Sequence, residues 1–207
     1  ATRGACARGL SAEQRAFVDA PLAESLVLVA AAGSGKTKSL LARFERCLAL
    51  LPEGSELQVI SFSNSAAATF QARWEAACGK CDVRIARTLH SWTKAHLLHA
   101  AGVREERVSM IIARACDVLA HVPPAARNLW LLVDEAQDCC PEQLQLLRLL
   151  QRQGASITLV GDPRQSIYGF MRAQARAFLD IAQRHRELTV NYRSPSAVVA
   201  LANALPC

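Results

Sequence analysis

The amino-acid sequence predicts an α/β fold, in which a parallel sheet carries helices on both faces. Short apolar runs alternate along the chain with longer segments of helical periodicity, and this order is typical of strand–helix–strand units. A chain of 207 residues is long enough to bury the core of one such domain. We see no internal repeat and no low-complexity linker that would break the alternation.

Five apolar runs are short enough to predict strands rather than helices. They are Ser25–Ala30, Leu57–Phe62, Val83–Thr88, Leu129–Asp134 and Ser156–Val160. The segments with helical spacing are Thr37–Leu51, Asn64–Cys78, His90–Ala101, Glu105–Ala120, Pro141–Gln153 and Arg172–His185. Two of these helices form a short helical insertion, at about residues 91–128, between two strands of the expected sheet.

The charge and hydropathy of the chain narrow its possible partners. The net charge is +6, and a modest basic excess is compatible with a nucleic-acid partner. No apolar run reaches the roughly 20 residues of a membrane span, so we expect no membrane partner. The first ten residues bear arginine, lack acidic residues and do not begin with Met, which favours the cut edge of a longer chain over the alternative, a remnant of a transit peptide.

A glycine-bearing loop follows the first expected strand and leads into a helix. It fits the phosphate-binding pattern G-x-x-x-x-G-K-[ST] except at its first position, which is alanine. The residues predicted to bind a nucleotide here are Ala30, Ala31, Ala32, Gly33, Ser34, Gly35, Lys36 and Thr37. Small residues let backbone N–H groups approach phosphate oxygens, while the lysine would neutralise phosphate charge and Thr37 would bind Mg²⁺.

A phosphate loop of this class needs a second strand that ends in a carboxylate, and "LWLLVDEAQD" supplies it. Its apolar run places Asp134 at the carboxyl edge of the sheet, where ligands of open α/β sheets bind. We expect Asp134 to hold Mg²⁺ and Glu135 to act as the general base for an attacking water. The cofactors predicted from these residues are therefore ATP and Mg²⁺, and the reaction is hydrolysis.

The chain has eight cysteines, of which Cys78 and Cys81 stand at the spacing of zinc ligands. A zinc site needs two more ligands, and none is obvious from the sequence. Cys47 and Cys116 fall in helical patterns, and a nucleotide site implies an intracellular, reducing compartment, the nucleus or the cytoplasm. We therefore interpret the cysteines as free thiols.

Six blocks of sequence, taken in order, resemble the motifs of the UvrD/Rep/PcrA-like superfamily 1 DNA helicases. They are "AAAGSGKT", "SFSNSAAATF", "RTLHS", "LLVDEAQD", "VGDPRQSIYGF" and "NYRS". The likeness extends from Leu10 to about Asn203. It implies the N-terminal ATP-binding domain of a helicase, with the fold of a RecA-like P-loop NTPase domain.

The resemblance also implies roles for residues around the nucleotide. Gln165 matches the glutamine that senses the γ-phosphate, Tyr192 the residue that stacks on adenine, and Arg193 one that reaches the γ-phosphate. Gln14 matches the glutamine that recognises adenine. A structural interpretation of Gln14 stays open, because Ser11 and Gln14 also fit a helix capping box.

A second group of residues is expected to contact single-stranded DNA or the tail of a tailed duplex. These candidates are Phe62, Asn64, His90, Tyr168 and Phe170. Aromatic faces that stack on successive bases bind single strands without recognising a particular sequence. Phe170 stands where the family usually has Trp, and Ala31 where it commonly has Gly, so this chain departs from the family pattern at both places.

The domain organisation expected from the resemblance is a RecA-like ATP-binding domain at residues 1–186, followed at 187–207 by the start of a truncated second RecA-like domain. We expect the chain to be a fragment of a longer helicase or a truncated descendant, with the remainder of a helicase chain as its partner. The leading functional hypothesis is an ATP-dependent DNA helicase. The alternative is a non-motor ATP-binding module that binds single-stranded nucleic acid or a partner protein.

Overall fold

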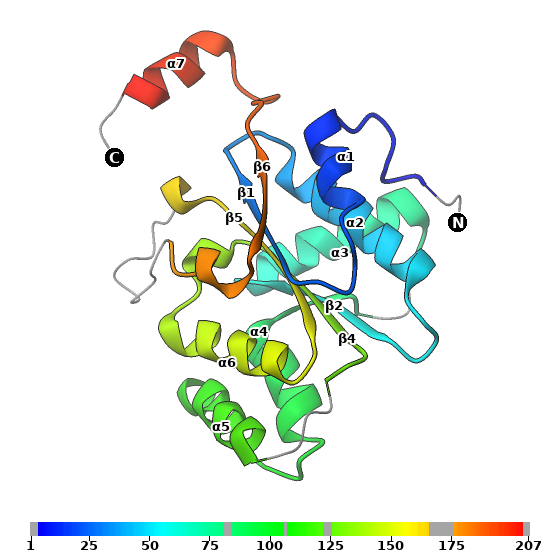
Figure 1. Ribbon diagram of the computed structural model, residues 1–207, viewed down its shortest axis with the longest axis vertical. Helices are drawn as coiled ribbons and strands as arrows, with labels where there is room; N and C mark the ends of the chain where they lie inside the picture. Colours follow the sequence, from blue (N-terminus) through cyan, green and yellow to red (C-terminus); the bar gives the residue numbers. More distant parts are fainter. Residues whose placement is uncertain (1–3, 81–83, 106, 122–125, 166–175, 205–207) are drawn as a thin grey trace.

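The computed structural model describes residues 4–80, 84–105, 107–121, 126–165 and 176–204 (Figure 1). Six strands form one sheet in the order β3-β2-β4-β5-β1-β6, and every neighbouring pair is parallel. The strands are β1 (Leu26–Ala30), β2 (Glu56–Ser61), β3 (Ala86–Thr88), β4 (Leu129–Val133), β5 (Ser156–Gly161) and β6 (Arg184–Leu188). Because all strands run in one direction, their carboxyl ends lie at one edge of the sheet.

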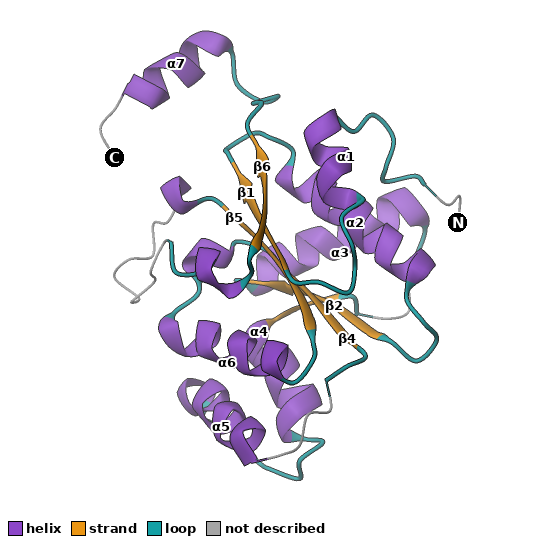
Figure 2. Ribbon diagram, viewed as in Figure 1, coloured by secondary structure: helices purple, strands orange, loops and turns teal. Residues whose placement is uncertain are grey.

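Helices cover both faces of this sheet, as Figure 2 shows. One layer consists of α1 (Ala12–Val18), α2 (Lys36–Leu50) and α3 (Asn64–Cys78). The other contains α4 (Leu89–Trp92), the π-helix η1 (Thr93–Leu98), α5 (Val108–His121) and α6 (Pro141–Arg152). The predicted α/β class, with helices on both faces, is confirmed. None of the described helices has the length and apolar character needed to span a membrane.

Side chains of the central strands alternate between two hydrophobic cores, one under each helix layer. In β1, Leu26 and Leu28 pack in the core of α1–α3, whereas Val27 packs in the core of α4–α6. All three side chains are at most 1% exposed. Burying each of them stabilises the fold by about 1.5–3 kcal/mol. This two-sided burial explains why the central strands are apolar throughout rather than alternating.

Polar residues directly after two strands begin the next helices. Ser63 Oγ accepts a hydrogen bond from Ala66 N (3.1 Å) at the start of α3. Thr88 Oγ1 accepts one from Ser91 N (3.3 Å) at the start of α4. Such caps satisfy N–H groups that a helix leaves unpaired at its first turn. They also place the residues that follow β2 and β3 at the carboxyl edge of the sheet.

The helix predicted for Arg172–His185 is wrong in the part that the structure describes. Residues 176–188 form the 3₁₀ turn η5 (Leu179–Ile181) and then β6. β6 pairs with β1 from Leu26↔Arg184 to Ala30↔Leu188. Its sequence, RHREL, lacks an apolar run because the strand lies at the edge of the sheet and is largely solvent-exposed. β6 also extends two residues past the expected domain boundary after residue 186.

Candidate nucleotide site

The carboxyl edge of the sheet gathers the segments singled out in the sequence. The phosphate loop leaves β1, and the carboxylates of "DEAQD" leave β4. β5 lies between these two strands and contributes the segment that contains η3 (Pro163–Gln165). Edges of this kind, outside the carboxyl ends of parallel strands, are where open α/β sheets bind their ligands.

The phosphate loop depends on two glycines with left-handed backbones. Gly33 has φ 72° and Gly35 has φ 85°, a conformation that residues with a Cβ rarely adopt. Gly35 is the N-cap of α2, and none of the described side chains caps that helix. The first N–H groups of α2 are thus available to an anion. Ser34 Oγ is buried without a hydrogen-bond partner among the described residues, so the loop fits a ligand with acceptor oxygens.

The side chain of Gln14 forms a hydrogen bond to the backbone of the phosphate loop. Its Oε1 accepts a hydrogen bond from Ser11 N (2.9 Å), and its Nε2 donates one to Ser34 O (2.9 Å). Ser11 Oγ in turn accepts from Gln14 N, which completes a capping box. The structural interpretation of Gln14 is therefore correct for this structure. Its expected contact with adenine stays a prediction.

Lys36 and Glu135 form an ion pair across the end of β5. Lys36 is the first residue of α2, and its ammonium group is largely buried. Glu135 has φ 53° and is the only non-glycine residue with positive φ in the described part of the chain. Asp134 precedes it and accepts a hydrogen bond from Glu135 N through Oδ1 (3.0 Å). Lysine and carboxylates thus meet at the end of the phosphate loop, and their expected contacts with phosphate and Mg²⁺ stay predictions.

A chain of hydrogen bonds continues from Glu135 to Gln165. Gln137 Nε2 donates to Glu135 Oε2 (2.9 Å), and Gln137 Oε1 accepts from Asp162 N (3.1 Å). The carboxylate of Asp162 then accepts a hydrogen bond from Gln165 Nε2. Gly161 permits this contact, because a Cβ at that position would lie 2.7 Å from Gln137 Oε1. No role was predicted from the sequence for Gln137 or Asp162, although both residues lie inside the quoted motifs.

Two carboxylates of the site hold their protons more tightly than usual. Burial raises the pKa of Asp134 to about 6, against the lowering effect of Lys36. Burial also raises the pKa of Asp138 to about 6, with a further contribution from the charge of Glu135. Asp138 Oδ1 is buried and lacks a hydrogen-bond partner among the described residues. A divalent cation at Asp134 would favour the ionised carboxylate, so the donor set fits Mg²⁺ bound by Asp134 and Thr37.

We expect the affinity for Mg²⁺-ADP to weaken as pH falls below neutrality. Asp134 is ionised above its pKa of about 6 and protonated below it, and only the ionised form binds Mg²⁺ well. Lowering the pH from about 7.5 to about 5.5 should weaken binding by about fourfold. Calorimetric titrations at both values test this. In Asp134→Asn only the pH dependence of the nucleotide itself should remain, and an unchanged pH dependence in that variant would contradict the assignment.

The segment after β6 lies against the phosphate loop. Tyr192 N donates a hydrogen bond to Gly33 O (2.9 Å), and Ala31 N donates to Leu188 O (3.2 Å). A Cβ at Gly33 would lie 2.9 Å from Arg193 Cβ. Tyr192 and Arg193 are both exposed, with Tyr192 at 59%. Both residues thus stand beside the loop, as their expected contacts with the nucleotide require.

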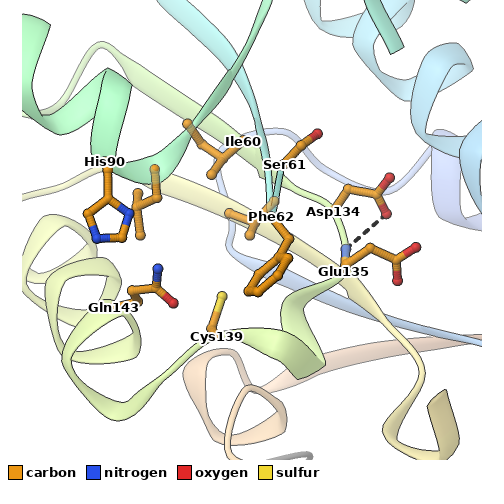
Figure 3. Close-up of a pocket in the computed structure, with 10 residues that line it drawn as sticks. Ile60, Ser61, Phe62, His90, Asp134, Glu135, Cys139 and Gln143 are labelled. Carbon is orange, nitrogen blue, oxygen red and sulfur yellow. Dashed lines mark hydrogen bonds between the residues drawn. The ribbon is translucent and has the colours of Figure 1, made fainter. Parts of the chain in front are cut away.

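Some of the predicted DNA-contacting residues share a pocket with the carboxylates. Figure 3 shows Phe62 and His90 lining the same pocket as Asp134 and Glu135. Burial lowers the pKa of His90, so its imidazole is neutral at physiological pH and can form hydrogen bonds without adding charge. Asn64 is exposed at the first turn of α3. The expected stacking residues Tyr168 and Phe170 lie outside the described residues.

Two further side chains of this pocket were not found from the sequence. Cys139 and Gln143 line it together with Phe62 and His90 (Figure 3). Gln143 Oε1 accepts a hydrogen bond from Cys140 N (2.9 Å) at the start of α6. The only signal in the sequence is that both residues follow "DEAQD", the motif that begins directly after a strand.

Comparison with protein families identifies the domain. The family model AAA_19, described as an AAA domain, matches residues 14–171, which include the phosphate loop, both carboxylates and Gln165. The chain belongs to the AAA_19 family. Tyr192 and Arg193, which stand beside the loop, lie beyond the residues that this family model spans.

Relatives of this AAA_19 domain include DNA helicases. The chain is 28% identical over 192 residues to R568 of Acanthamoeba polyphaga mimivirus, a protein named for an ATP-dependent DNA helicase; the match covers 86% of this chain and 28% of that protein. It is 38% identical over 91 residues to the ATP-dependent DNA helicase Srs2 of Schizosaccharomyces pombe, covering 41% of this chain and 10% of Srs2. The chain thus spans less than a third of the length of either relative.

A solved structure of similar fold is the Pif1 helicase from Candida albicans. It superposes with a TM-score of 0.60 at 20% identity, over 94% of this chain and 43% of the Pif1 chain. At this identity the likeness shows the fold, which is that of a RecA-like helicase domain. The resemblance to UvrD, Rep and Srs2 is confirmed as a distant, partial similarity over the ATP-binding region.

Proposed function

We propose that this AAA_19 domain is the ATP-hydrolysing part of a DNA helicase that moves along single-stranded DNA and separates duplexes. The observation that carries the proposal is the ion pair between Lys36 and Glu135. It joins the phosphate loop to the residue best placed to activate water, although 99 positions separate the two in sequence. The DNA substrate is suggested by the names of the relatives, which are DNA helicases.

The residues of the site divide the chemistry of hydrolysis between them. When ATP binds, the ion pair between Lys36 and Glu135 breaks, and Lys36 pairs with the β- and γ-phosphates instead. The carboxylate of Glu135 is then free. Glu135 then accepts a proton from the water that attacks the γ-phosphorus, as the bond to the leaving ADP oxygen breaks. Thr37 and Asp134 would hold Mg²⁺, which when bound would offset the negative charge of the phosphates. Arg193 extends from the segment beside Gly33 and compensates charge on the γ-phosphate.

Coupling to DNA would use the hydrogen bonds that leave this centre. Gln165 senses the γ-phosphate, and Gln137 and Asp162 link it to Glu135. Phe62 and His90 contact DNA from the pocket that Asp134 and Glu135 also line. The hydrogen bonds would connect Gln165 to Glu135, which lines the same pocket as Phe62 and His90. Tyr168 and Phe170 add stacking contacts.

A second RecA-like domain, beginning after β6 ends at Leu188, would close the site from the side of Tyr192. That side chain is 59% exposed, and Arg193 is exposed as well. Closure excludes water and brings further positive charge to the γ-phosphate, and opening after hydrolysis produces movement along the strand. The domain described here therefore supplies one half of the motor.

An assay of ATP hydrolysis and duplex separation tests the proposal. The 207-residue chain should bind a fluorescent ATP analogue, hydrolyse ATP slowly and leave a tailed duplex intact. The chain joined to a second RecA-like domain should hydrolyse ATP orders of magnitude faster with single-stranded DNA and should unwind the duplex. DNA binding without any DNA-stimulated hydrolysis in the joined protein would favour a non-motor module instead. Unwinding by the 207-residue chain that depends on Lys36 would contradict the need for a second domain.

A further inference from the structure

Three side chains with metal-binding atoms meet on the side of the molecule covered by α1–α3, away from the carboxyl edge of the sheet. They are Cys6 in the N-terminal segment, Glu45 in α2 and Cys78 at the end of α3. One ligand atom from each lies within 4.8 Å of the others. The sequence showed only the Cys78–Cys81 spacing, and Cys81 lies outside the described residues. Folding brings two further potential ligands to Cys78.

The distance between the two sulfur atoms is informative. Cys6 Sγ and Cys78 Sγ are 3.8 Å apart. A disulfide requires about 2.05 Å. Two thiolates on one tetrahedral Zn²⁺, with Zn–S bonds of about 2.3 Å, are separated by about 3.8 Å. The two thiols are hydrogen-bonded to each other at this distance, which is also the separation that a shared tetrahedral ion imposes.

Backbone N–H groups orient the carboxylate of Glu45 toward this pair. Glu45 Oε1 accepts hydrogen bonds from Gly4 N (2.9 Å) and Ala5 N (3.0 Å), and Oε2 accepts one from Cys6 N (3.1 Å). A carboxylate has about four acceptor positions, so one remains for a cation. No lysine or arginine of the described chain forms an ion pair with Glu45. Outer hydrogen bonds of this kind are typical of metal-binding carboxylates.

The cluster can be reached from solvent. Glu45 and Cys78 both line a hollow in the surface, which Gly4 and Ala7 of the N-terminal segment also border. In Figure 1 the N-terminal segment lies beside α1 and α2. An ion could thus enter after the chain has folded, with Cys6 closing the site from its buried side.

We propose that Cys6, Cys78 and Glu45 bind a Zn²⁺ ion that fastens the N-terminal segment to α2 and α3. Thiolate ligands favour Zn²⁺ over Mg²⁺, so the ion is chemically distinct from the one expected at Asp134. On binding, each thiol releases its proton to solvent and forms one Zn–S bond, and water occupies the fourth position. Glu45 lies nine residues beyond Lys36 in α2, about 14 Å along the helix, so the metal does not contact the nucleotide site.

Cobalt substitution gives a direct readout of this site. The reduced, chelator-treated chain is titrated with Co²⁺, and we expect one equivalent to produce the charge-transfer band of cobalt–thiolate bonds, which Zn²⁺ then removes. Cys6→Ser and Cys78→Ser should each remove most of this band, and Glu45→Gln should weaken Co²⁺ binding by about tenfold or more. Cys116→Ser is the matched control, because Cys116 is a half-buried thiol on α5 in the other helix layer. Circular dichroism checks that each variant is folded.

A second measurement needs no variant and does not depend on the proposed helicase function. Alkylation of the unaltered chain, mapped by mass spectrometry, should slow at Cys6 and Cys78 when Zn²⁺ is added and stay unchanged at Cys116. Failure of Co²⁺ to give the band, a band of full strength in Cys6→Ser, or unchanged alkylation at Cys6 would overturn the proposal. A Cys6–Cys78 disulfide that forms in place of metal binding would also overturn it.

Discussion

Lys36→Ala is expected to abolish ATP binding, whereas Glu135→Gln should keep binding and lose turnover. Lys36 is the only described cation paired with Glu135, and it is the one that phosphates would attract away. Without Lys36, the negative charge of the β- and γ-phosphates loses the lysine that would compensate it. Glutamine at 135 keeps the size of the side chain and leaves Asp134 for Mg²⁺, but it cannot accept a proton. Losing a general base typically slows a reaction by about 10²–10⁴-fold.

The two effects are separated by measuring binding with a fluorescent ATP analogue and turnover by phosphate release, with single-stranded DNA present. Lys38→Ala is the matched control, since Lys38 is an exposed lysine of the same helix whose Nζ donates to Gly9 O (2.9 Å). It should bind and hydrolyse ATP like the unaltered protein. Turnover of Glu135→Gln close to that of the unaltered protein would remove Glu135 from the role of base.

Arg43→Leu in α2 is expected to destabilise the fold strongly. Arg43 is 1% exposed and has no carboxylate partner among the described residues. Its guanidinium donates instead to the carbonyl oxygens of Phe17 (2.9 Å), Val18 (3.3 Å) and Ala20 (3.1 Å). It also lies over the Phe17 ring, 5.2 Å from its centre. The guanidinium of Arg43 therefore links the C-terminal end of α1 to α2, the helix that follows the phosphate loop. Gln14 belongs to the same helix α1.

Leucine at position 43 fills part of the volume but removes the Arg43 donor from the carbonyl oxygens of Val18 and Ala20, whereas Phe17 O still accepts from Ala20 N (3.3 Å). Each unsatisfied group costs about 1–3 kcal/mol, so we expect the free energy of unfolding to fall by at least about 2 kcal/mol. Urea titration monitored by circular dichroism measures the change. Arg46→Leu is the control: Arg46 pairs with Asp19 at 3.1 Å near the surface, and such a pair contributes about 1 kcal/mol or less. Equal losses in the two variants would show that the bonds of Arg43 contribute little.

The parts of the fold that were predicted correctly depend on short stretches of sequence. The central strands β1, β4 and β5 are buried on both faces, so each appears as an apolar run that ends where the strand ends. The phosphate loop needs left-handed glycines and a lysine at fixed spacing, and this spacing is visible in the sequence. The sequence patterns of these elements are local, so they can be recognised without knowing which residues pack around them.

The parts that were missed depend on contacts between distant residues. β6 carries polar residues because one side of the strand has no neighbour, so its sequence resembles a helix or loop more than a strand. Nothing in the sequence distinguishes Arg43 from the other charged residues of α2, and only the fold shows that its guanidinium bonds to the end of α1. Cys6 and Cys78 are 72 positions apart, and no spacing rule joins them.

The backbone of Glu135 offers a way to locate the site that uses no motif. A left-handed conformation costs a residue with a side chain about 1–2 kcal/mol relative to a right-handed one, and glycine would adopt it without that cost. Selection for stability alone would therefore favour glycine at this position, yet the described chain has a carboxylate at φ 53°. Strain that persists in this way marks a place where another requirement outweighs stability. Among the described residues, backbone angles and the distinction between glycine and other residues would thus be enough to direct attention to position 135, without any helicase motif.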